Sequence, residues 1–431
     1  MSLKSFVYTP PELSAENRNH GRNVLYVNGF LMLFGYFTII SVTALHFTHD
    51  IRLTATAVGV ALAIRQFIQQ GLDLFGGVFG ERFGYRISIT LGCFIRALGF
   101  IGFSVARSFP ELLFAALTAG FGGMFFDATG SGAMAAVVKP EERSRVFSIS
   151  ATINNIGAAL GPLVGIYAYA FWGYRPVGLL AALVFVVIGL ETYFFLPNHI
   201  ERYAASQKMP APSLSRSLRA AINNREYIIT IAALMGFWSI LSQISLTVPL
   251  IANKIGGASG VAIILGINAF LAIPLQYPLV RIAERYMDLM KILGFSAIIC
   301  VAGMVLVYTA ATMPLEITGI VLATIGSLAV TPITAAISAK VAPPRALAVF
   351  YGISAIGVGA GGALGMFIGG RLYDLQISLH SQWFLGVFTA IVGAAVSWAF
   401  LQTKTPGICA LPASRKGLAA MMKDQSGIVH P

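Results

Sequence analysis

Twelve long apolar runs constrain this chain more than any other feature of its sequence. A helix needs about 20 mostly apolar residues to cross the hydrocarbon core of a bilayer. Breaks at proline, glycine and charged residues separate runs of that length at residues 24–46, 56–80, 87–106, 111–136, 146–171, 176–197, 227–252, 259–283, 289–310, 315–340, 347–372 and 382–402. We therefore predict an all-α integral membrane protein with twelve transmembrane helices in two sets of six.

The composition agrees with a lipid environment. Hydrophobic residues make up 57% of the 431 positions and charged residues only 11%, whereas soluble domains carry roughly 25% charged residues. The net charge of +12 sits mostly in short gaps between the apolar runs. That placement favours contact with anionic lipid headgroups over nucleic acid as the partner of the basic residues.

The polar gaps divide the chain and orient it. We expect an N-terminal bundle over 1–197, a central linker over 198–226 with an amphipathic helix near 215–223, a C-terminal bundle over 227–402 and a tail over 403–431. Lysine and arginine gather on the side of the termini, and few lie on the opposite side: Arg52, Arg107, Arg175, Lys254 and Arg371. This asymmetry predicts that both termini are cytoplasmic.

No motif points to a metal, a cofactor or nucleotide hydrolysis. Cys93, Cys300 and Cys409 lie far apart, without metal-ligand spacing, and no phosphate-binding loop of the G-x-x-x-x-G-K-[ST] type occurs. His46 and Asp50 form a short H-x-x-x-D pattern, which leaves an integral-membrane transferase as a remote alternative. We expect no metal and no cofactor.

Five charged residues lie within the predicted spans of the first half and away from the span ends: Arg65, Asp73, Arg96, Asp127 and Glu191. A charge at the centre of a membrane helix costs about 2.5–3.5 kcal/mol, so these side chains must avoid lipid. Arg65, Gln69 and Asp73 are spaced by four residues and form one polar stripe on a helix. We predict a charge network of Arg65, Asp73 and Arg96 that faces the bundle or a wet cavity.

The carboxylates of this group have two interpretations. They can form an ion-pair network that holds the first bundle together, or one of them can exchange protons as the protein changes conformation. A nearby arginine favours the charged carboxylate and burial disfavours it, so a moving arginine would change its proton affinity. Asp127 is the first candidate for proton coupling because it lies near mid-depth, and Glu191 is the second.

Neutral polar and aromatic residues at mid-depth suggest a central cavity for a small molecule. A mixture of amides, aromatic rings and a carboxylate suits amphipathic, partly aromatic compounds. The two arginines leave zwitterions and anions open as substrates. The predicted cavity residues are Gln69, Asn154, Asn155, Trp238, Gln243, Asn268 and Tyr351.

The loop after the second span carries a specific pattern. In "GGVFGERFGYR" the residues Gly77, Glu81, Arg82, Gly84 and Arg86 have a spacing that resembles the loop signature of the major facilitator superfamily. The resemblance implies two pseudo-symmetric six-helix bundles with substrate bound between them. It also implies that this loop is a conformational latch, to which Arg143 and Arg145 of the next loop on that side would contribute. The second half keeps only Glu284 and Arg285 of the pattern.

A second pattern refines the resemblance. "NIGAALGPLVG" in the fifth span contains Gly157, Gly161, Pro162 and Gly165, and it is similar to the antiporter motif of that superfamily. Together with "IRQFIQQG", "FIRALGF" and "GGMFFD", it resembles the drug:proton antiporters. The resemblance implies a monomeric, multi-pass protein of a bacterial inner membrane that exports drug-like molecules against protons.

One departure from the family keeps an alternative open. The usual arginine of the fourth span, four residues before a glycine, is replaced by Ala116 before Gly120. Proton coupling must therefore use other residues or be absent. A uniporter, or an exporter of one native metabolite, lipid or siderophore, remains the alternative function.

Overall fold

The structure is a computed structural model that describes residues 14–139, 142–197, 214–342, 347–379, 383–404 and 406. Within these residues every regular element is helical. The predicted all-α membrane fold is therefore confirmed for the part of the chain that can be seen.

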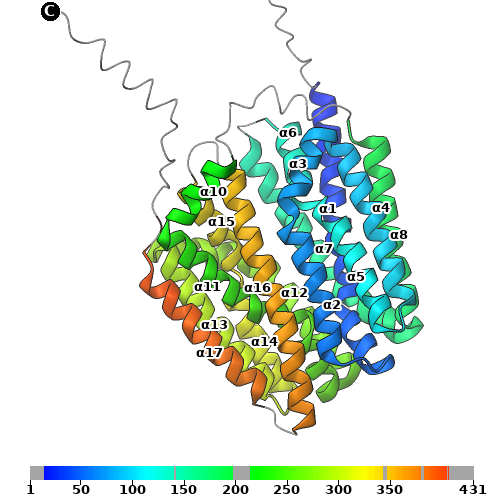
Figure 1. The fold of residues 1–431 in the computed structure, drawn as a ribbon, viewed down its shortest axis with the longest axis vertical. Coiled ribbons are helices and arrows are strands. Elements are labelled where there is room, and N and C mark those ends of the chain that lie inside the picture. The colour runs from blue at the N-terminus through cyan, green and yellow to red at the C-terminus, as the bar shows by residue number, and fades with distance from the viewer. Residues whose placement is uncertain are drawn as a thin grey trace, which may run out of the picture.

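The first half of the chain forms a bundle of long and broken helices. Its elements are α1 (Ala15–Leu45), the π-helical turn η1 (His46–Asp50), α2 (Ala55–Gly71), α3 (Asp73–Phe83), α4 (Tyr85–Val105), α5 (Phe109–Met124), α6 (Asp127–Val137), α7 (Arg143–Trp172) and α8 (Tyr174–Phe195). In this bundle α1 packs on α7 and α8, and α4 packs on α5 and α8 (Figure 1). We call the end of the molecule that holds η1 the η1 end.

The second half repeats this plan. Its elements are α10 (Leu214–Asn223), α11 (Arg225–Leu241), the 3₁₀ turn η3 (Ser242–Ser245), α12 (Thr247–Tyr286), α13 (Leu289–Thr309), α14 (Met313–Ser327), α15 (Val330–Val341), α16 (Leu347–Ser378) and α17 (Phe384–Gln402). Here α13 packs on α14 and α17, and α11 packs on α16 and α17. Helix α10 confirms the amphipathic helix expected in the linker. Its end of the molecule, opposite η1, is the α10 end (Figure 1).

Small residues set the closest helix contacts, and they do so in equivalent places of the two halves. A Cβ on Gly99 of α4 would meet the Ala119 backbone of α5 at 2.5 Å. In the second half, a Cβ on Gly303 of α13 would meet the Ala323 backbone of α14 at 2.2 Å. Without a hydrophobic driving force between helices in lipid, such close backbone approach supplies the packing energy.

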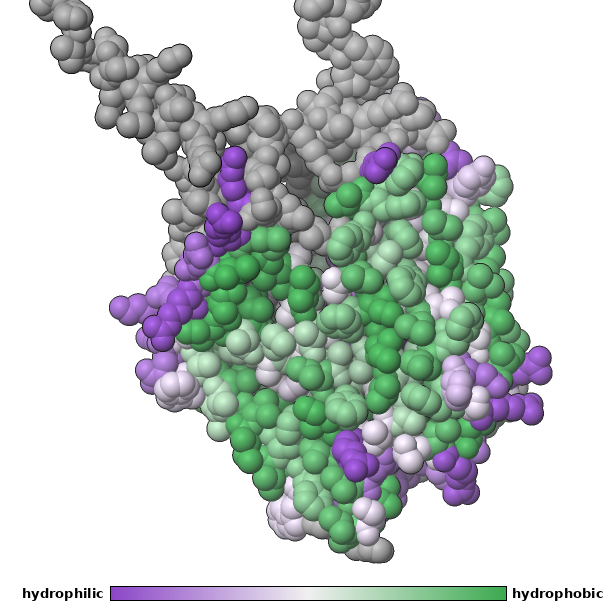
Figure 2. Space-filling model, in the orientation of Figure 1, coloured by the Kyte–Doolittle hydropathy of each residue, from purple (hydrophilic) through white to green (hydrophobic). Residues whose placement is uncertain are grey.

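The surface matches a protein surrounded by lipid. Large apolar side chains such as Phe114, Phe171 and Trp172 are more than 70% exposed. Figure 2 shows hydrophobic residues over most of the visible face, with hydrophilic residues gathered beside α10 and toward the η1 end. An apolar belt between two polar ends is what a bilayer requires of a multi-pass protein.

Ten stretches of the described chain are long and apolar enough to cross a membrane. The predicted second span is not among them because it is divided at Leu72 into α2 and α3. The predicted seventh and eighth spans merge because Arg225–Ile267 counts as one stretch. Within it Gly257 of α12 has φ +60° and ψ −156°, where the chain turns between two helical arms. The exact count of twelve stays a prediction.

Candidate functional site

The polar stripe of α2 folds into a buried network around Arg65. The guanidinium donates from Nη1 to Gln69 Oε1 at 2.9 Å, and from Nη2 to Tyr36 Oη at 2.7 Å and to Gln66 Oε1 at 2.9 Å. Gln66 Nε2 in turn donates to Gln70 Oε1 at 3.0 Å. Helical spacing places these amides on neighbouring turns of α2, so Arg65 and Gln69 of the predicted stripe are hydrogen-bonded in one set with Gln66 and Gln70. The place of Asp73 in this network stays a prediction.

Arg96 brings α4 into the same network. Its Nη2 donates to Gln69 Oε1 at 3.3 Å, and its guanidinium carbon lies 5.2 Å from the centre of the Tyr36 ring and 5.0 Å from that of Phe185. Arg65 and Arg96 are only 1% and 2% exposed. The structure therefore brings the two predicted arginines together on Gln69 and Tyr36, inside the first bundle and away from lipid.

The two predicted aspartates of this region occupy equivalent positions at helix breaks. Asp73 is the first residue of α3, directly after the break at Leu72. Asp127 is the first residue of α6, directly after the break at Phe125 and Phe126. The partial positive charge of a helix N-terminus stabilises a carboxylate by about 0.3–1 kcal/mol. Sequence patterning missed both breaks because the apolar runs continue through them.

The two helix breaks are in contact at Gly76. A Cβ on Gly76 of α3 would lie 1.9 Å from the Met124 carbonyl oxygen at the end of α5. On the next turns Thr129 Oγ1 of α6 donates to the Gly76 carbonyl at 3.1 Å. The absence of a side chain at Gly76 therefore permits the close approach of α3 to the end of α5. Discontinuous helices are elements from which transporters build ion and substrate sites.

Several predicted site residues have described backbones but lie outside the described side chains. These are Asp127, Glu81, Arg143 and Asn268. Glu191 is described, and it lies half-buried on α8 one turn before that helix ends at Phe195. The roles proposed for the two carboxylates in proton coupling thus stay predictions.

Two of the predicted amides face other helices. Asn155 of α7 donates from Nδ2 to Gln276 Oε1 of α12 at 3.1 Å, and so bridges the two halves. Asn154 lies against α1, where a Cβ on Gly29 would meet its Oδ1 at 2.2 Å. Gln276, which sequence analysis did not select, could have been found as an amide flanked by Pro274 and Pro278 within an apolar run.

The remaining predicted cavity residues belong to the second half. Gln243 is buried and fully engaged there: its Nε2 donates to the Gly365 carbonyl at 2.5 Å, and its Oε1 accepts from Thr247 Oγ1 at 3.0 Å. Trp238 is partly buried against the core. Tyr351 is 40% exposed, and its hydroxyl donates to the Ala335 carbonyl at 3.3 Å. The hydrogen bonds of Gln243 and Tyr351 thus lie within the second half, and their place in a shared cavity stays a prediction.

The predicted latch loop forms the junction of α3 and α4 at the α10 end. Gly84 has φ +102° and ψ +137° and belongs to both helix ends as their capping residue. Gly77 is partly buried on α3, whereas Arg82 and Arg145 are exposed. The guanidinium carbon of Arg86 lies 4.7 Å from the centre of the Tyr193 ring of α8. The loop is thus held to its own bundle by ring contacts as well as by the tight turn.

Gly84→Ala is expected to lower the free energy of unfolding by about 1–3 kcal/mol, because an L-residue is strained at this φ and ψ. The measurement is thermal unfolding in detergent. Gly71→Ala is the matched control, because a Cβ there would meet only the Phe67 ring at 3.5 Å, an ordinary contact. Equal melting temperatures for the two variants would show that alanine at position 84 causes no backbone strain.

The predicted antiporter motif is a backbone-to-backbone seam between α7 and α1. Cβ atoms on Gly157, Gly161 and Gly165 would lie 2.4, 2.7 and 2.1 Å from carbonyl oxygens of α1, those of Phe30, Phe34 and Thr38. Pro162 lies inside α7 next to this seam. The spacing of four residues therefore has a packing function: it places all three glycines on the face that meets α1.

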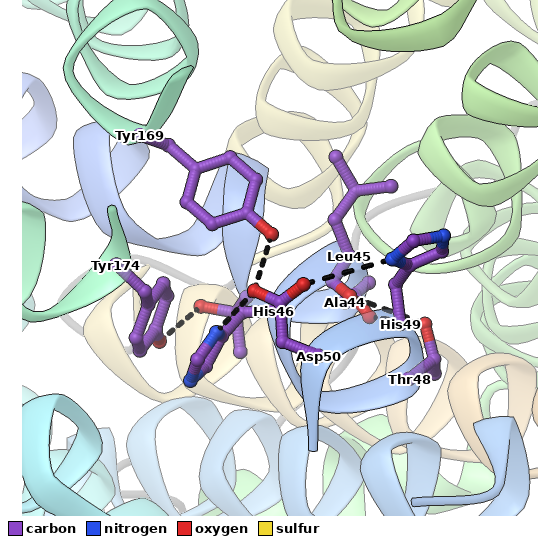
Figure 3. Close-up of polar contacts among 9 residues, drawn as sticks. Ala44, Leu45, His46, Thr48, His49, Asp50, Tyr169 and Tyr174 are labelled. Atoms are coloured by element: carbon purple, nitrogen blue, oxygen red, sulfur yellow. Dashed lines mark hydrogen bonds and ion pairs between the residues drawn. The ribbon is translucent and has the colours of Figure 1, made fainter. Parts of the chain in front are cut away.

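A second polar cluster lies at the η1 end, where η1 meets α7 and α8 (Figure 3). Asp50 Oδ2 lies 2.8 Å from His46 Nδ1 and accepts from Tyr169 Oη at 2.7 Å. The His46 ring stacks on Tyr174 with 4.0 Å between centres. The H-x-x-x-D pattern thus ties three elements together through aromatic and hydrogen-bond contacts.

Glu316 is a buried carboxylate that sequence analysis did not select. It lies in the first turn of α14, is 0% exposed, and neither of its oxygens has a hydrogen-bond partner among the described residues. Its position at the start of an apolar run is typical of a side chain at the membrane surface, so the sequence pattern did not predict that Glu316 is buried. Helix α14 packs against α12 and α13, and the burial of Glu316 is a tertiary feature that the sequence pattern does not encode.

Replacing Glu316 by glutamine is expected to raise the free energy of unfolding by about 1–3 kcal/mol at neutral pH. Burial of an unpaired carboxylate costs several kcal/mol, which exceeds the 0.3–1 kcal/mol that a helix N-terminus returns. Thermal unfolding of the purified variant checks this. Glu226→Gln on the first turn of α11 is the control, and a loss of stability specific to Glu316→Gln would contradict the expectation.

Comparison with known proteins places the chain among transporters. The model of the Major Facilitator Superfamily matches residues 25–327. Multidrug resistance protein MdtH of Escherichia coli (strain SMS-3-5 / SECEC) is 30% identical over 396 residues, which cover 91% of this chain and 97% of the relative. The protein of the same name from Salmonella arizonae is 29% identical over 397 residues, covering 91% and 96%.

Solved structures show the same fold. The nucleoside transporter NupG superposes with a TM-score of 0.71 at 12% identity, covering 98% of that chain and 89% of this one. A POT family transporter in complex with 5-aminolevulinic acid gives a TM-score of 0.69 at 16% identity, covering 94% and 88%. At these identities the likeness concerns the arrangement of helices alone.

Proposed function

Because the chain belongs to the Major Facilitator Superfamily and is a transporter rather than an enzyme, we propose that it exports amphipathic, drug-like small molecules in exchange for protons by alternating access. In this proposal the protein is a monomer in a bacterial inner membrane, with both termini in the cytoplasm. The α10 end then faces the cytoplasm and the η1 end faces outward. The excess of lysine and arginine in the loops of the α10 end supports this orientation.

The single observation that carries the proposal is the Arg65–Gln69–Arg96–Tyr36 network. Two buried arginines share one amide and one aromatic ring within the first bundle. One of them, Arg65, lies on α2, which packs along α16 of the second half. Such a network holds fixed positive charge where a carboxylate can gain or lose a proton, because each charged state of the carboxylate interacts differently with the arginines. The names of the MdtH relatives support drug-like substrates.

Asp127 and Glu191 are the proposed proton carriers, and Asp127 is the first choice. Its place at the start of α6, directly after a break in the span, supports this choice. The half-buried Glu191 lies near the end of α8, where a simpler role at the membrane surface is equally compatible with its position. Asp73, at the matching break of the second span, is proposed to belong to the charge network.

The proposed substrate groups are amides and aromatic rings of both halves. The Asn155–Gln276 bond crosses between the halves, so it must break or move if the halves rock against one another. Gln69, Asn154, Trp238, Gln243, Asn268 and Tyr351 remain proposed contacts. The Gly77–Arg86 loop, with Glu81, Arg82, Gly84, Arg143 and Arg145, remains the proposed latch at the cytoplasmic end.

A transporter without proton coupling is the second candidate. Ala116 stands where drug:proton antiporters of this superfamily carry an arginine, and it is fully buried against its neighbours. Ala116 is equally compatible with a uniporter, or with an exporter of one metabolite, lipid or siderophore. The test is export from proteoliposomes with and without an imposed pH gradient, over a small panel of cationic, zwitterionic and anionic compounds. Export that ignores the gradient would reject antiport.

A further inference from the structure

At the η1 end, a carboxylate of one half caps a helix of the other. Asp374 lies one turn before the end of α16. Its Oδ1 accepts from the backbone N–H of Ala55 at 2.9 Å and its Oδ2 from that of Thr56 at 2.8 Å. The Thr56 hydroxyl donates to the same carboxylate. These are the first two residues of α2, more than 300 positions away in sequence.

This contact satisfies backbone groups that α2 cannot satisfy alone. The first N–H groups of any helix lack partners within it. Thr54 caps only one of them, by accepting from the Ala57 N–H at 3.1 Å. Asp374 accepts from the two N–H groups that precede that of Ala57, those of Ala55 and Thr56, and its negative charge lies at the positive end of the helix dipole. Charge-assisted bonds of this kind are roughly twice as strong as neutral ones.

The backbones around the cap are in direct contact. A Cβ on Gly370, one helical turn before Asp374, would lie 2.4 Å from the Ala55 carbonyl oxygen. A Cβ on Gly59, one turn into α2, would lie 2.4 Å from the Met366 carbonyl oxygen. The cap therefore sits at the end of a seam along which α2 and α16 touch, and both halves must separate there if this end opens.

We infer that Asp374 is a positioning residue of the transport cycle: it latches the two halves together at the outward-facing end by capping α2 across the interface. The inference rests on the proposed alternating access. In the state that opens this end, water takes over the N–H groups of Ala55 and Thr56, so the latch is reversible. Removing it shifts the population toward the outward-open state and leaves the interior of each bundle unchanged.

The test measures the conformation directly. Spin labels at Arg107→Cys and Ala311→Cys, in a chain with Cys93, Cys300 and Cys409 replaced by alanine, report the distance between loops of the two halves at the η1 end. Both positions are exposed. Asp374→Ala is expected to raise the open-to-closed ratio about fivefold, the size of effect that removal of one helix cap produces. Asp374→Asn, which keeps one acceptor oxygen, is expected to lie between Asp374→Ala and the parent.

The controls separate the latch from general damage and from the proposed function. Asp288→Asn removes an exposed carboxylate that pairs with Lys291 at 3.8 Å, and it should leave the distances unchanged. A distance distribution of Asp374→Ala identical to that of the parent would overturn the latch, even in a fully active exporter. Shifted distances in a protein that exports nothing would support the latch while rejecting export.

Discussion

Asp127→Asn is expected to abolish the effect of a pH gradient on export. A gradient of one pH unit is worth about 1.4 kcal/mol per proton, so exchange of one proton per substrate can concentrate substrate about tenfold. Without a group that releases and binds the proton, the accumulation ratio in proteoliposomes should fall to about one. Counterflow of substrate in the absence of a gradient should persist, because it requires no net proton movement.

The control for this prediction is the second carboxylate. Glu191→Gln changes the same chemistry on α8, and it should leave gradient-driven accumulation near the parent value. If Glu191→Gln abolishes accumulation and Asp127→Asn does not, the carrier is Glu191. If neither variant changes an export that responds to the gradient, the proposed roles of both residues are wrong.

Gly165→Ala is expected to lower the free energy of unfolding by about 3 kcal/mol, the upper end of the range for overpacking. The added methyl group would lie 2.1 Å from the Thr38 carbonyl oxygen and 2.9 Å from Ser41 Oγ. A backbone oxygen cannot rotate away, so α7 must move off α1. Thermal unfolding in detergent measures the loss, and the yield of monodisperse protein gives a second readout.

Gly386→Ala is the matched control for the seam between α1 and α7. Gly386 is also a buried helical glycine, but a Cβ there meets only a methyl group of Thr309 at 3.8 Å. The same substitution should therefore be neutral or slightly stabilising, since alanine is the better helix former. Similar melting temperatures for the two variants would show that α7 can shift without cost and that the motif is not a packing seam.

The sequence pattern predicted those features that depend on residues close together in the chain. The stripe of Arg65, Gln69 and the neighbouring glutamines follows from helical spacing and from the cost of charge in lipid. The breaks at Leu72 and at Phe125 could not be predicted, because an apolar run reads the same whether its helix is continuous or divided.

Contacts between distant segments could not be predicted at all. Gln243 was selected for its depth, but its hydrogen bonds to Gly365 and Thr247 engage it within the second half. The roles of Glu316 and Asp374 could not be predicted, because each lies near the end of an apolar run, where a charged residue is common. Their surroundings depend on which helix face turns toward which neighbour, and hydropathy does not encode that choice.

The sequence by itself determined the solvent, the helical class and the division into two halves, because the length and spacing of apolar runs are dictated by the thickness of the bilayer. It also determined the superfamily, through glycines whose spacing matches helix packing. Only the tertiary structure decided that two arginines share Gln69 and that Asp374 caps α2. Hydrogen bonds form over about 3 Å, and only the packed helices bring residues hundreds of positions apart within that distance.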